Sequence, residues 1–294
     1  MGSAGPYGPI VNGTQIVFYE YRPNKPAGYA FLVLFAIATL AHLVYFFVLR
    51  AWFFIPFLLG GISEVFGYYA RAWASDEPDK VGPFLLQNLL ILAAPPFLAA
   101  TIYMSLGRVL TALGAQRHSL VKPSWITKIY VIIDFGCIVT QLVGSAILGS
   151  GDASAVTTSK TMILSGLIAQ LVALSFFVVN CWHVYRRCAS DPFLGSEKQD
   201  LSFVWQNHFR AIMLVALVMI VRSTVRMAEY LQGSDGFIAS HEVFIYVFDA
   251  FPMLLVMIVF LVIHPGRLVR DARVELGKYN RASSGSIMLQ NQTF

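Results

Sequence analysis

Charged side chains interrupt an apolar stretch in the C-terminal third of the chain. Residues 221–230 read VRSTVRMAEY and directly follow the apolar run MLVALVMI. Arg222, Arg226 and Glu229 are spaced i, i+4 and i+7, so a helix would place all three on one face. A charged group at membrane depth costs about 2.5–3.5 kcal/mol on insertion scales. This cost indicates that the three groups pair with others or line a polar pathway.

The same spacing recurs in two other apolar segments. The segments SEVFGYYAR and HEVFIYVFDAF each place two charged groups and a tyrosine on one helical face. Asp134 and Gln141 are also seven residues apart. Carboxylates outnumber arginines in this set, and pairing can offset part of their desolvation cost. The candidate cavity residues are Glu64, Tyr68, Arg71, Gln87, Asn88, Asp134, Gln141, Gln170, Arg222, Arg226, Glu229, Glu242, Tyr246 and Asp249.

The overall composition excludes a soluble domain. Of the 294 residues, 57% are hydrophobic and 13% are charged, and the mean hydropathy is +0.65. A soluble domain carries about 25% charged residues. In a membrane protein the net charge of +5 is informative about which side carries the excess of basic residues. No nucleic-acid partner is expected. The three cysteines lie in or beside apolar runs and suggest no disulfide framework.

Seven apolar runs are long enough to cross a hydrocarbon core, which needs about 20 residues of helix. The first 26 residues lack a basic start followed by an apolar block, so the first run is expected to act as the insertion signal. The expected spans are residues 27–49, 51–71, 83–106, 125–149, 161–185, 209–231 and 240–264.

The distribution of basic residues predicts the orientation. Five of the 21 Lys and Arg residues fall on the N-terminal side, thirteen on the other side and three within spans. The positive-inside rule then places the N-terminus outside and the C-terminus in the cytosol. The predicted fold class is an all-α integral membrane protein, a seven-transmembrane helix bundle. Residues 1–26 form its extracellular segment, 27–266 the membrane domain and 267–294 a disordered cytosolic tail. Asn12 begins a glycosylation sequon on the outer side.

The charged groups concentrate in the outer half of the predicted bundle. The inner half of the last span, PMLLVMIVFLVI, has no ionisable group. We therefore expect a polar, partly hydrated cavity that is open toward the outer face and closed by apolar packing on the cytosolic side. The alternative is a set of structural salt bridges, which is favoured most for Arg222 and Arg226. Pro95 and Pro96 interrupt the third span and predict either a packing kink or a hinge.

The order and spacing of these motifs resemble those of a known family over residues 20–267. The pattern E-x-x-G-Y-x-x-R at residues 64–71 is followed by Gln87, an AP…AA…Y run and Gly107-Arg108. Asp134…Gln141…Gly144 and Gly166…Gln170 come next, and the longest block runs from Arg222 through Gly236 to Asp249 and His264-Pro-Gly. The chain is thus similar to the fungal lipid-translocating exporters, the RTA-like seven-span proteins. It departs from their pattern in reading GSAILGSG at residues 144–151 instead of a tight glycine triplet.

The resemblance implies a plasma-membrane protein, or alternatively one of the endoplasmic reticulum or vacuole, that exports or flips amphiphiles. The implied ligands are membrane lipids, sphingoid long-chain bases or sterol-like toxic amphiphiles. No GxxxxGK[ST] loop is present, so active export would need ion coupling or an existing gradient. The hypothesis at this point is that Asp249 or Glu242 exchanges a proton during transport.

Other function classes remain open on the sequence. A seven-span lipid-sensing receptor fits the topology, although neither a DRY motif after span three nor an NPxxY motif after span seven is present. An intramembrane zinc hydrolase is disfavoured because the six histidines form no i, i+4 pair, so no enzyme activity and no metal site are expected.

No cofactor is expected either, but a haem or porphyrin could be bound with His42 or His241 as ligand. The small residues at Gly60-Gly61 and Gly144-Ser-Ala146 could pack helices within one chain or in a homodimer.

Overall fold

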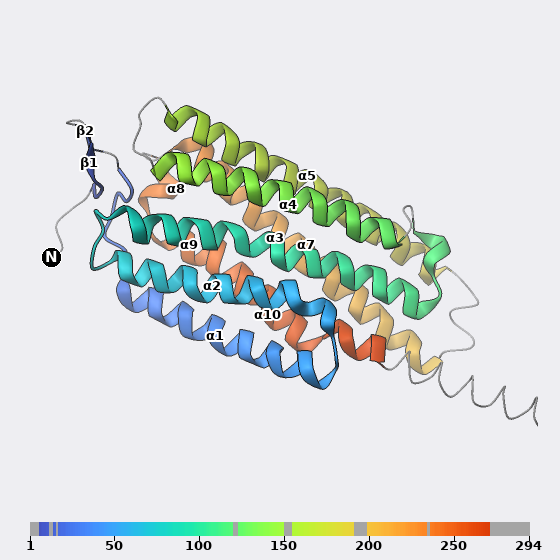
Figure 1. Ribbon diagram of the computed structural model, residues 1–294. Coiled ribbons are helices and arrows are strands. Elements are labelled where there is room, and N and C mark those ends of the chain that lie inside the picture. Colours follow the sequence, from blue (N-terminus) through green and yellow to red (C-terminus); the bar gives the residue numbers. More distant parts are fainter. Residues whose placement is uncertain are drawn as a thin grey trace, which may run out of the picture.

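Long helices lying side by side form a single bundle in the computed structural model, which describes residues 6–11, 14–15, 17–119, 123–149, 155–190, 199–233 and 236–270 (Figure 1). The predicted sequon residue Asn12 and the predicted tail beyond residue 270 lie outside the described residues. The longer elements are α1 (Lys25–Val48), α2 (Ile55–Ala74), α3 (Val81–Leu113), α4 (Pro123–Gly149), α5 (Ala155–Ala189), α7 (Gln199–Gln232) and α10 (Phe251–Val262). The shorter ones are β1 (Ile10–Val11), β2 (Thr14–Gln15), η1 (Trp52–Phe54), η2 (Gln116–His118), α8 (Phe237–Ser240), α9 (Val243–Ile245) and the π-helical turn η3 (Tyr246–Ala250).

Six helices among the described residues are long and apolar enough to cross a membrane. The predicted helical membrane protein is therefore confirmed. The expected fourth span forms the 27-residue α4, which is not among these six because some of its side chains lie outside the described set. The count of seven spans and the orientation of the termini stay predictions.

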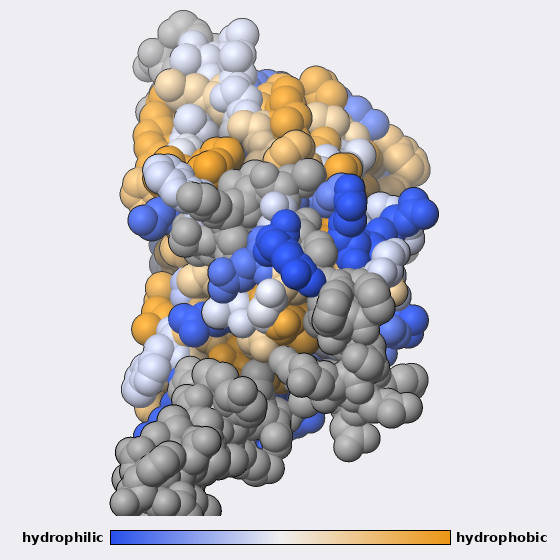
Figure 2. Space-filling model, turned by 90° about the vertical axis from the view of Figure 1, so that its right-hand side faces the viewer, coloured by the Kyte–Doolittle hydropathy of each residue, from blue (hydrophilic) through white to orange (hydrophobic). Residues whose placement is uncertain are grey.

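The outer surface of α1 has the composition expected of a helix that faces lipid. Val33, Ile37, Leu40, Val44 and Phe47 follow one another at helical spacing and are all exposed. Water would penalise such a stripe, whereas hydrocarbon accepts it at no cost. Strongly hydrophilic residues gather instead at the ends of the bundle, and Figure 2 shows the end at which α1 and α3 finish.

Glycines allow the helices to approach closely within the chain. A Cβ added to Gly60 would lie 2.0 Å from Leu98 Cδ1 and 3.0 Å from the Ala94 carbonyl oxygen, so α2 and α3 are in direct backbone contact. Gly144 has the same function between α4 and α5, where the Ser159 carbonyl oxygen would be 3.0 Å away. Gly60 and Gly144 thus pack helices within one chain, the first of the two alternatives that the sequence left open for these positions.

The N-terminal segment packs against the end of the bundle at which α1 begins, here called the N-terminal end. Phe18 stacks on Phe84 of α3 with ring centroids 4.1 Å apart. The Gly8 N–H donates to Asp79 Oδ1 at 2.8 Å, and Arg22 Nε donates to the Ser75 carbonyl oxygen at 2.9 Å. The segment is therefore fixed over the turn between α2 and α3.

The seventh predicted span contains a π-helical turn where Asp249 lies. Residues 240–264 were expected to form one helix, and the helix begins at Val243 and continues through α9, η3 and α10 as one candidate membrane span. Pro252, near the start of α10, cannot donate a backbone hydrogen bond to the preceding turn. Asp249 lies in η3. Single π-helical turns inside helices are frequent at functional sites.

Candidate functional site

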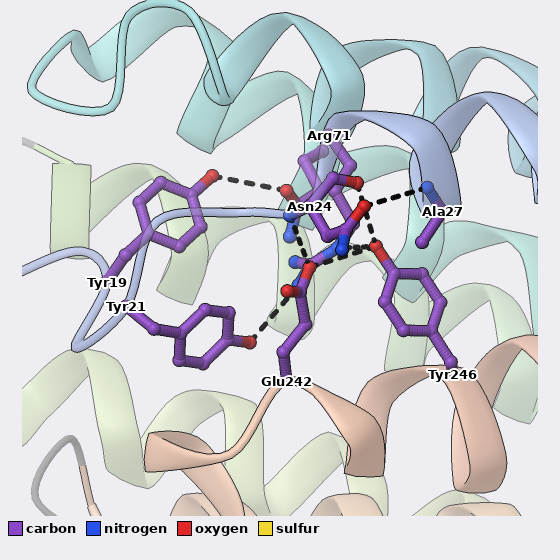
Figure 3. Close-up of polar contacts among 8 residues, drawn as sticks. Tyr19, Tyr21, Asn24, Ala27, Arg71, Glu242 and Tyr246 are labelled. Carbon is purple, nitrogen blue, oxygen red and sulfur yellow. Dashed lines mark hydrogen bonds and ion pairs between the residues drawn. The ribbon is translucent and has the colours of Figure 1, made fainter. Parts of the chain in front are cut away.

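Arg71 is the centre of a polar network at the N-terminal end of the bundle (Figure 3). Its side chain comes from the last turn of α2 and is only 1% exposed. One guanidinium nitrogen donates to Glu242 Oε1 at 2.8 Å and to the Tyr21 hydroxyl at 3.1 Å, and Nε donates to the Tyr246 hydroxyl at 3.0 Å. Tyr246 in turn donates to Glu242 Oε1 at 2.9 Å. The network therefore joins α2, η3 and the chain before α1.

The residues before α1 cover this network. The Asn24 backbone N–H donates to Glu242 Oε1 at 2.7 Å, and the Asn24 side chain caps α1 by accepting from the Ala27 N–H at 3.1 Å. The Tyr19 hydroxyl donates to Gln87 Oε1 at 3.1 Å, and burial raises the pKa of Tyr19 above its ordinary value. Residues 19–24, here called the cover segment, thus lie over Arg71 and Glu242 at the N-terminal end, where a cavity was expected.

A second network lies deeper and is centred on Asp249. Arg222 Nε donates to Asp249 Oδ1, and Arg226 donates to Asp249 Oδ2 at 2.6 Å and to Glu229 Oε2 at 3.0 Å. Arg222 is 1% exposed, and Asp249 and Arg226 are also buried. Asp249 therefore pairs with both buried guanidinium groups, and Glu229 is a second partner of Arg226. This is the ion pairing that the sequence favoured for both arginines.

The same network satisfies a backbone group that Pro95 leaves without a partner. Pro95 and Pro96 are buried inside the continuous helix α3. Proline has no N–H, so the carbonyl oxygen of Ile91, four residues earlier, has no intrahelical donor. Arg222 donates to that oxygen at 3.1 Å. This contact anchors α7 to α3, while the alternatives of a hinge and a packing kink remain predictions.

Glu64 is a carboxylate that takes part in none of the ion pairs among the described residues. Its side chain is completely buried, and neither oxygen accepts a hydrogen bond from any described residue. It interacts electrostatically with Asp249, Arg222 and Arg226. Tyr68, one turn along α2, is also completely buried, and its hydroxyl has no hydrogen-bond partner among the described residues. The interior of the bundle therefore holds unsatisfied polar groups beside a neutralised network.

A third polar group lies between α3, α4 and α5. Asp134 faces the Tyr103 hydroxyl, but the geometry between them is not that of a hydrogen bond. Gln141 donates to Gln170 at 3.4 Å, a long contact that leaves the other amide atom of each side chain without a partner in the described part of the chain. Asp134, Gln141 and Gln170 are each at most 2% exposed.

The structure therefore places the candidate cavity residues in two separate regions of the bundle instead of one. Gln87 accepts a hydrogen bond from Tyr19 of the cover segment. Asn88 is partly exposed and makes no hydrogen bond to either region among the described residues. Sequence reasoning missed the cover segment, although its aromatic residues directly before α1 are a signal of a packed segment. The arginine network comprises Glu64, Tyr68, Arg71, Arg222, Arg226, Glu229, Glu242, Tyr246 and Asp249, and the glutamine region comprises Asp134, Gln141 and Gln170.

The two histidines considered as haem ligands lie in different surroundings, and their role stays a prediction. His42 is completely buried, its Nε2 contacts the Met257 carbonyl oxygen at 2.9 Å, and it stacks or packs edge-on against the Phe54 and Phe57 rings. His241 is exposed at the N-terminal end and hydrogen-bonds within its own turn. Among the described residues, no group of three His, Cys, Asp or Glu side chains is arranged to hold a metal ion.

Several known proteins are similar in sequence to this chain over most of its length. Residues 57–272 match the family described as RTA1 like protein. Protoporphyrin uptake protein 1 of Saccharomyces cerevisiae is 33% identical over 283 residues, which cover 83% of this chain and 90% of that protein. Protein RTM1 of the same species is 38% identical over 213 residues, 71% of this chain and 66% of that protein. The sphingoid long-chain base transporter RSB1 is 24% identical over 275 residues, 83% of this chain and 72% of that protein. No solved structure matches the chain.

Proposed function

The chain belongs to the RTA1-like family, and on that premise we propose that it translocates a cationic amphiphile, such as a sphingoid long-chain base, across the plasma membrane. One relative is named a sphingoid long-chain base transporter. In this proposal seven helices span the membrane, with the N-terminus outside and the C-terminus in the cytosol. The observation that carries the proposal is Glu64, a completely buried carboxylate that accepts no hydrogen bond from the part of the chain that the structure describes.

A carboxylate in this position is costly for the fold. A buried charge without a partner loses its hydration, and a buried polar group without a hydrogen bond is also penalised. Ionisable groups inside membrane proteins usually mark the path of a substrate or proton. An ammonium group that enters beside Glu64 would supply both the missing counter-charge and the missing donors.

The ion pairs indicate which acids are available to a substrate. Asp249 is held by two arginines and Glu242 by Arg71, so neither is free to bind an amine without releasing a buried guanidinium. Glu64 and Asp134 accept no hydrogen bond from the described residues. We therefore assign amine binding and proton exchange to Glu64 and Asp134, in place of the Asp249 or Glu242 suggested by the sequence.

Translocation requires the cover segment to move. Release of the Asn24–Glu242 and Tyr21–Arg71 contacts would open the N-terminal end to the outer leaflet. The amine of the substrate would pass the arginine network while its alkyl chain stays against the apolar helix surfaces. A proton taken up by Glu64 after release of the amine would neutralise the site for the return step. No nucleotide is needed in this cycle.

The test is Glu64→Gln in the full chain, measured as efflux of a labelled sphingoid base from fungal cells that express it. Glutamine keeps the size of the side chain but removes the charge that binds an amine. We expect efflux to fall by about tenfold or more, the loss typical of a charge-assisted contact. Because a buried charge is removed, the thermal stability should stay the same or rise.

The matched control is Glu77→Gln, which makes the same change outside the bundle in the turn between α2 and α3. It should transport normally. Wild-type efflux from correctly localised Glu64→Gln protein would reject the proposal. A large loss of stability in that variant would show instead that Glu64 is structural.

A porphyrin is the second candidate substrate, because one relative is named a protoporphyrin uptake protein. Its two propionates would need cations, and Arg71 and Arg226 are the buried arginines nearest the N-terminal end. Both are already ion-paired, which disfavours this candidate. Uptake of fluorescent protoporphyrin by the same cells, unchanged in Glu64→Gln, would favour it over the cationic amphiphile.

A further inference from the structure

Two neighbouring polar groups on α2 lack hydrogen-bond partners. The Glu64 carboxylate and the Tyr68 hydroxyl are four residues apart, so both lie on the same face of the helix. Both side chains are completely buried, and neither group makes a hydrogen bond to the described residues. They interact electrostatically without being hydrogen-bonded to each other. The two carboxylate oxygens and the hydroxyl oxygen are therefore all able to accept hydrogen bonds from a ligand.

Aromatic packing holds the Tyr68 hydroxyl in this position. Phe35 of α1 stacks on the Tyr68 ring with centroids 5.4 Å apart, and the Phe31 ring lies 5.7 Å from the same ring. The Tyr246 ring of η3 follows at 6.4 Å and stacks on Phe31 at 5.2 Å. Because rings from α1 and η3 contact it, the Tyr68 ring cannot swing out of this position without displacing them. The hydroxyl is thus a fixed group on the same helix face as the carboxylate.

The arginine network has one more carboxylate than it has arginines. Its charged members are Arg71, Arg222, Arg226, Glu64, Glu229, Glu242 and Asp249. The other three carboxylates form ion pairs with the arginines, and Glu64 does not. With every group ionised, one monovalent cation beside Glu64 would balance the network, whereas a divalent cation would leave a buried positive charge.

A primary ammonium group matches both this charge and the number of acceptors. It has three N–H donors, as the lysine side chain does. Two of them would bond the Glu64 oxygens and the third the Tyr68 hydroxyl oxygen, and the hydrogen bonds would be charge-assisted. A trimethylammonium group has no N–H donor, so it would leave all of these acceptors unsatisfied.

The aromatic rings beside Tyr68 are not arranged to bind a trimethylammonium group instead. Such groups are bound over the open faces of aromatic rings. The Phe35 and Tyr68 rings stack on each other at an interplanar angle of 17°, and the Phe31 and Tyr246 rings do so at 8°. Each stacked pair covers one face of both of its rings, so these four rings do not form an open cage.

We propose that Glu64 and Tyr68 together select a primary ammonium group, and that Tyr68 is the specificity-determining residue of the site. This inference rests on the proposed function, in which Glu64 binds the amine of the substrate. It adds that amphiphiles with a primary amine are preferred over their trimethylammonium analogues. A site that hydrogen-bonds an N–H group discriminates strongly against an analogue without it, because the polar groups of the site then stay unpaired.

The test measures the binding of two amphiphiles with the same alkyl chain to the purified full-length protein. The probes are hexadecylamine and hexadecyltrimethylammonium, and tryptophan fluorescence reports the Kd of each. The wild type should bind the primary amine at least about a hundredfold more tightly. Tyr68→Phe keeps the ring but removes one acceptor, so it should raise the Kd of hexadecylamine about tenfold, the contribution of one hydrogen bond to a charged group. The Kd of hexadecyltrimethylammonium should not change, whereas a merely structural defect would weaken the binding of both.

The matched control is Tyr69→Phe, which makes the same change at the next residue, where the side chain is 47% exposed. It should bind both amphiphiles as the wild type does. Equal affinity of the wild type for the two amphiphiles, or an unchanged preference in Tyr68→Phe, would overturn the inference and leave the proposed function intact. Undiminished binding of hexadecylamine by Glu64→Gln, or no binding of hexadecylamine by the wild type, would reject the proposed function itself.

Discussion

Replacing Asp249 by asparagine should destabilise the bundle more than any other loss of a single charge in the arginine network. The carboxylate receives one guanidinium on each oxygen, from Arg222 and from Arg226 at 2.6 Å. Asparagine keeps one acceptor oxygen but turns an NH₂ group toward a cation. Arg222 would then lose the one ion-pair partner it has among the described residues, while Arg226 would keep only its contact with Glu229.

The size of the effect follows from this burial. Removing one partner of a buried ion pair costs about 3–5 kcal/mol because the remaining charge stays desolvated. A change of 1 kcal/mol shifts Tm by about 2–4 °C in chains of this size range. Asp249→Asn should therefore lower Tm by roughly 6–20 °C. Thermal unfolding of the detergent-purified protein, followed by intrinsic fluorescence, measures this shift.

The matched control makes the same substitution in an exposed ion pair. Asp76 contacts Lys25 at the same 2.6 Å distance, but its side chain is 51% exposed. Asp76→Asn should change the stability by at most about 1 kcal/mol, since exposed pairs contribute little. Equal Tm shifts for the two variants would refute the argument from burial. So would the absence of coupling between Asp249→Asn and Arg226→Gln in a double-mutant cycle, because groups in one ion-pair network are expected to be non-additive.

Two further predictions concern the packing of the bundle and its cover. Gly60→Ala should cost about 1–3 kcal/mol, as overpacking does, because the new methyl group would collide with Leu98. Gly82→Ala, where a Cβ meets nothing within 4 Å, should be tolerated in the same thermal unfolding assay, and equal losses would contradict the close α2–α3 contact. Tyr19→Phe removes the hydroxyl that donates to Gln87, and it should weaken the cover by about 1 kcal/mol. Hydrogen exchange of the cover segment should then become about fivefold faster, and an unchanged rate would show that this bond does not hold it.

The sequence was sufficient for the parts of the fold that depend on local composition. Apolar runs of about 20 residues can only be helices in lipid, since every backbone group must be satisfied within the segment. The helices α1 and α2 accordingly lie within a few residues of the expected spans. The family was also visible, because Arg222, Arg226 and Asp249 keep a characteristic order and spacing. Helical periodicity placed Arg222 and Arg226 on one face, where both reach Asp249.

Which charges pair with which could be decided only by the tertiary structure. Periodicity describes one helix at a time and contains no information on the rotation of one helix against another. It therefore could not show that Asp249 neutralises two arginines while Glu64 is left without a hydrogen bond. Nor could it predict that Arg222 would satisfy the carbonyl oxygen freed by Pro95.

The cover segment, too, could be found only from the tertiary structure. Residues 19–24 contain no helical pattern, and their contacts with Arg71 and Glu242 join positions about 50 and 218 residues apart. The sequence set which groups each helix carries into lipid. Packing then determined which of those groups pair with one another and which have no hydrogen-bond partner among the described residues.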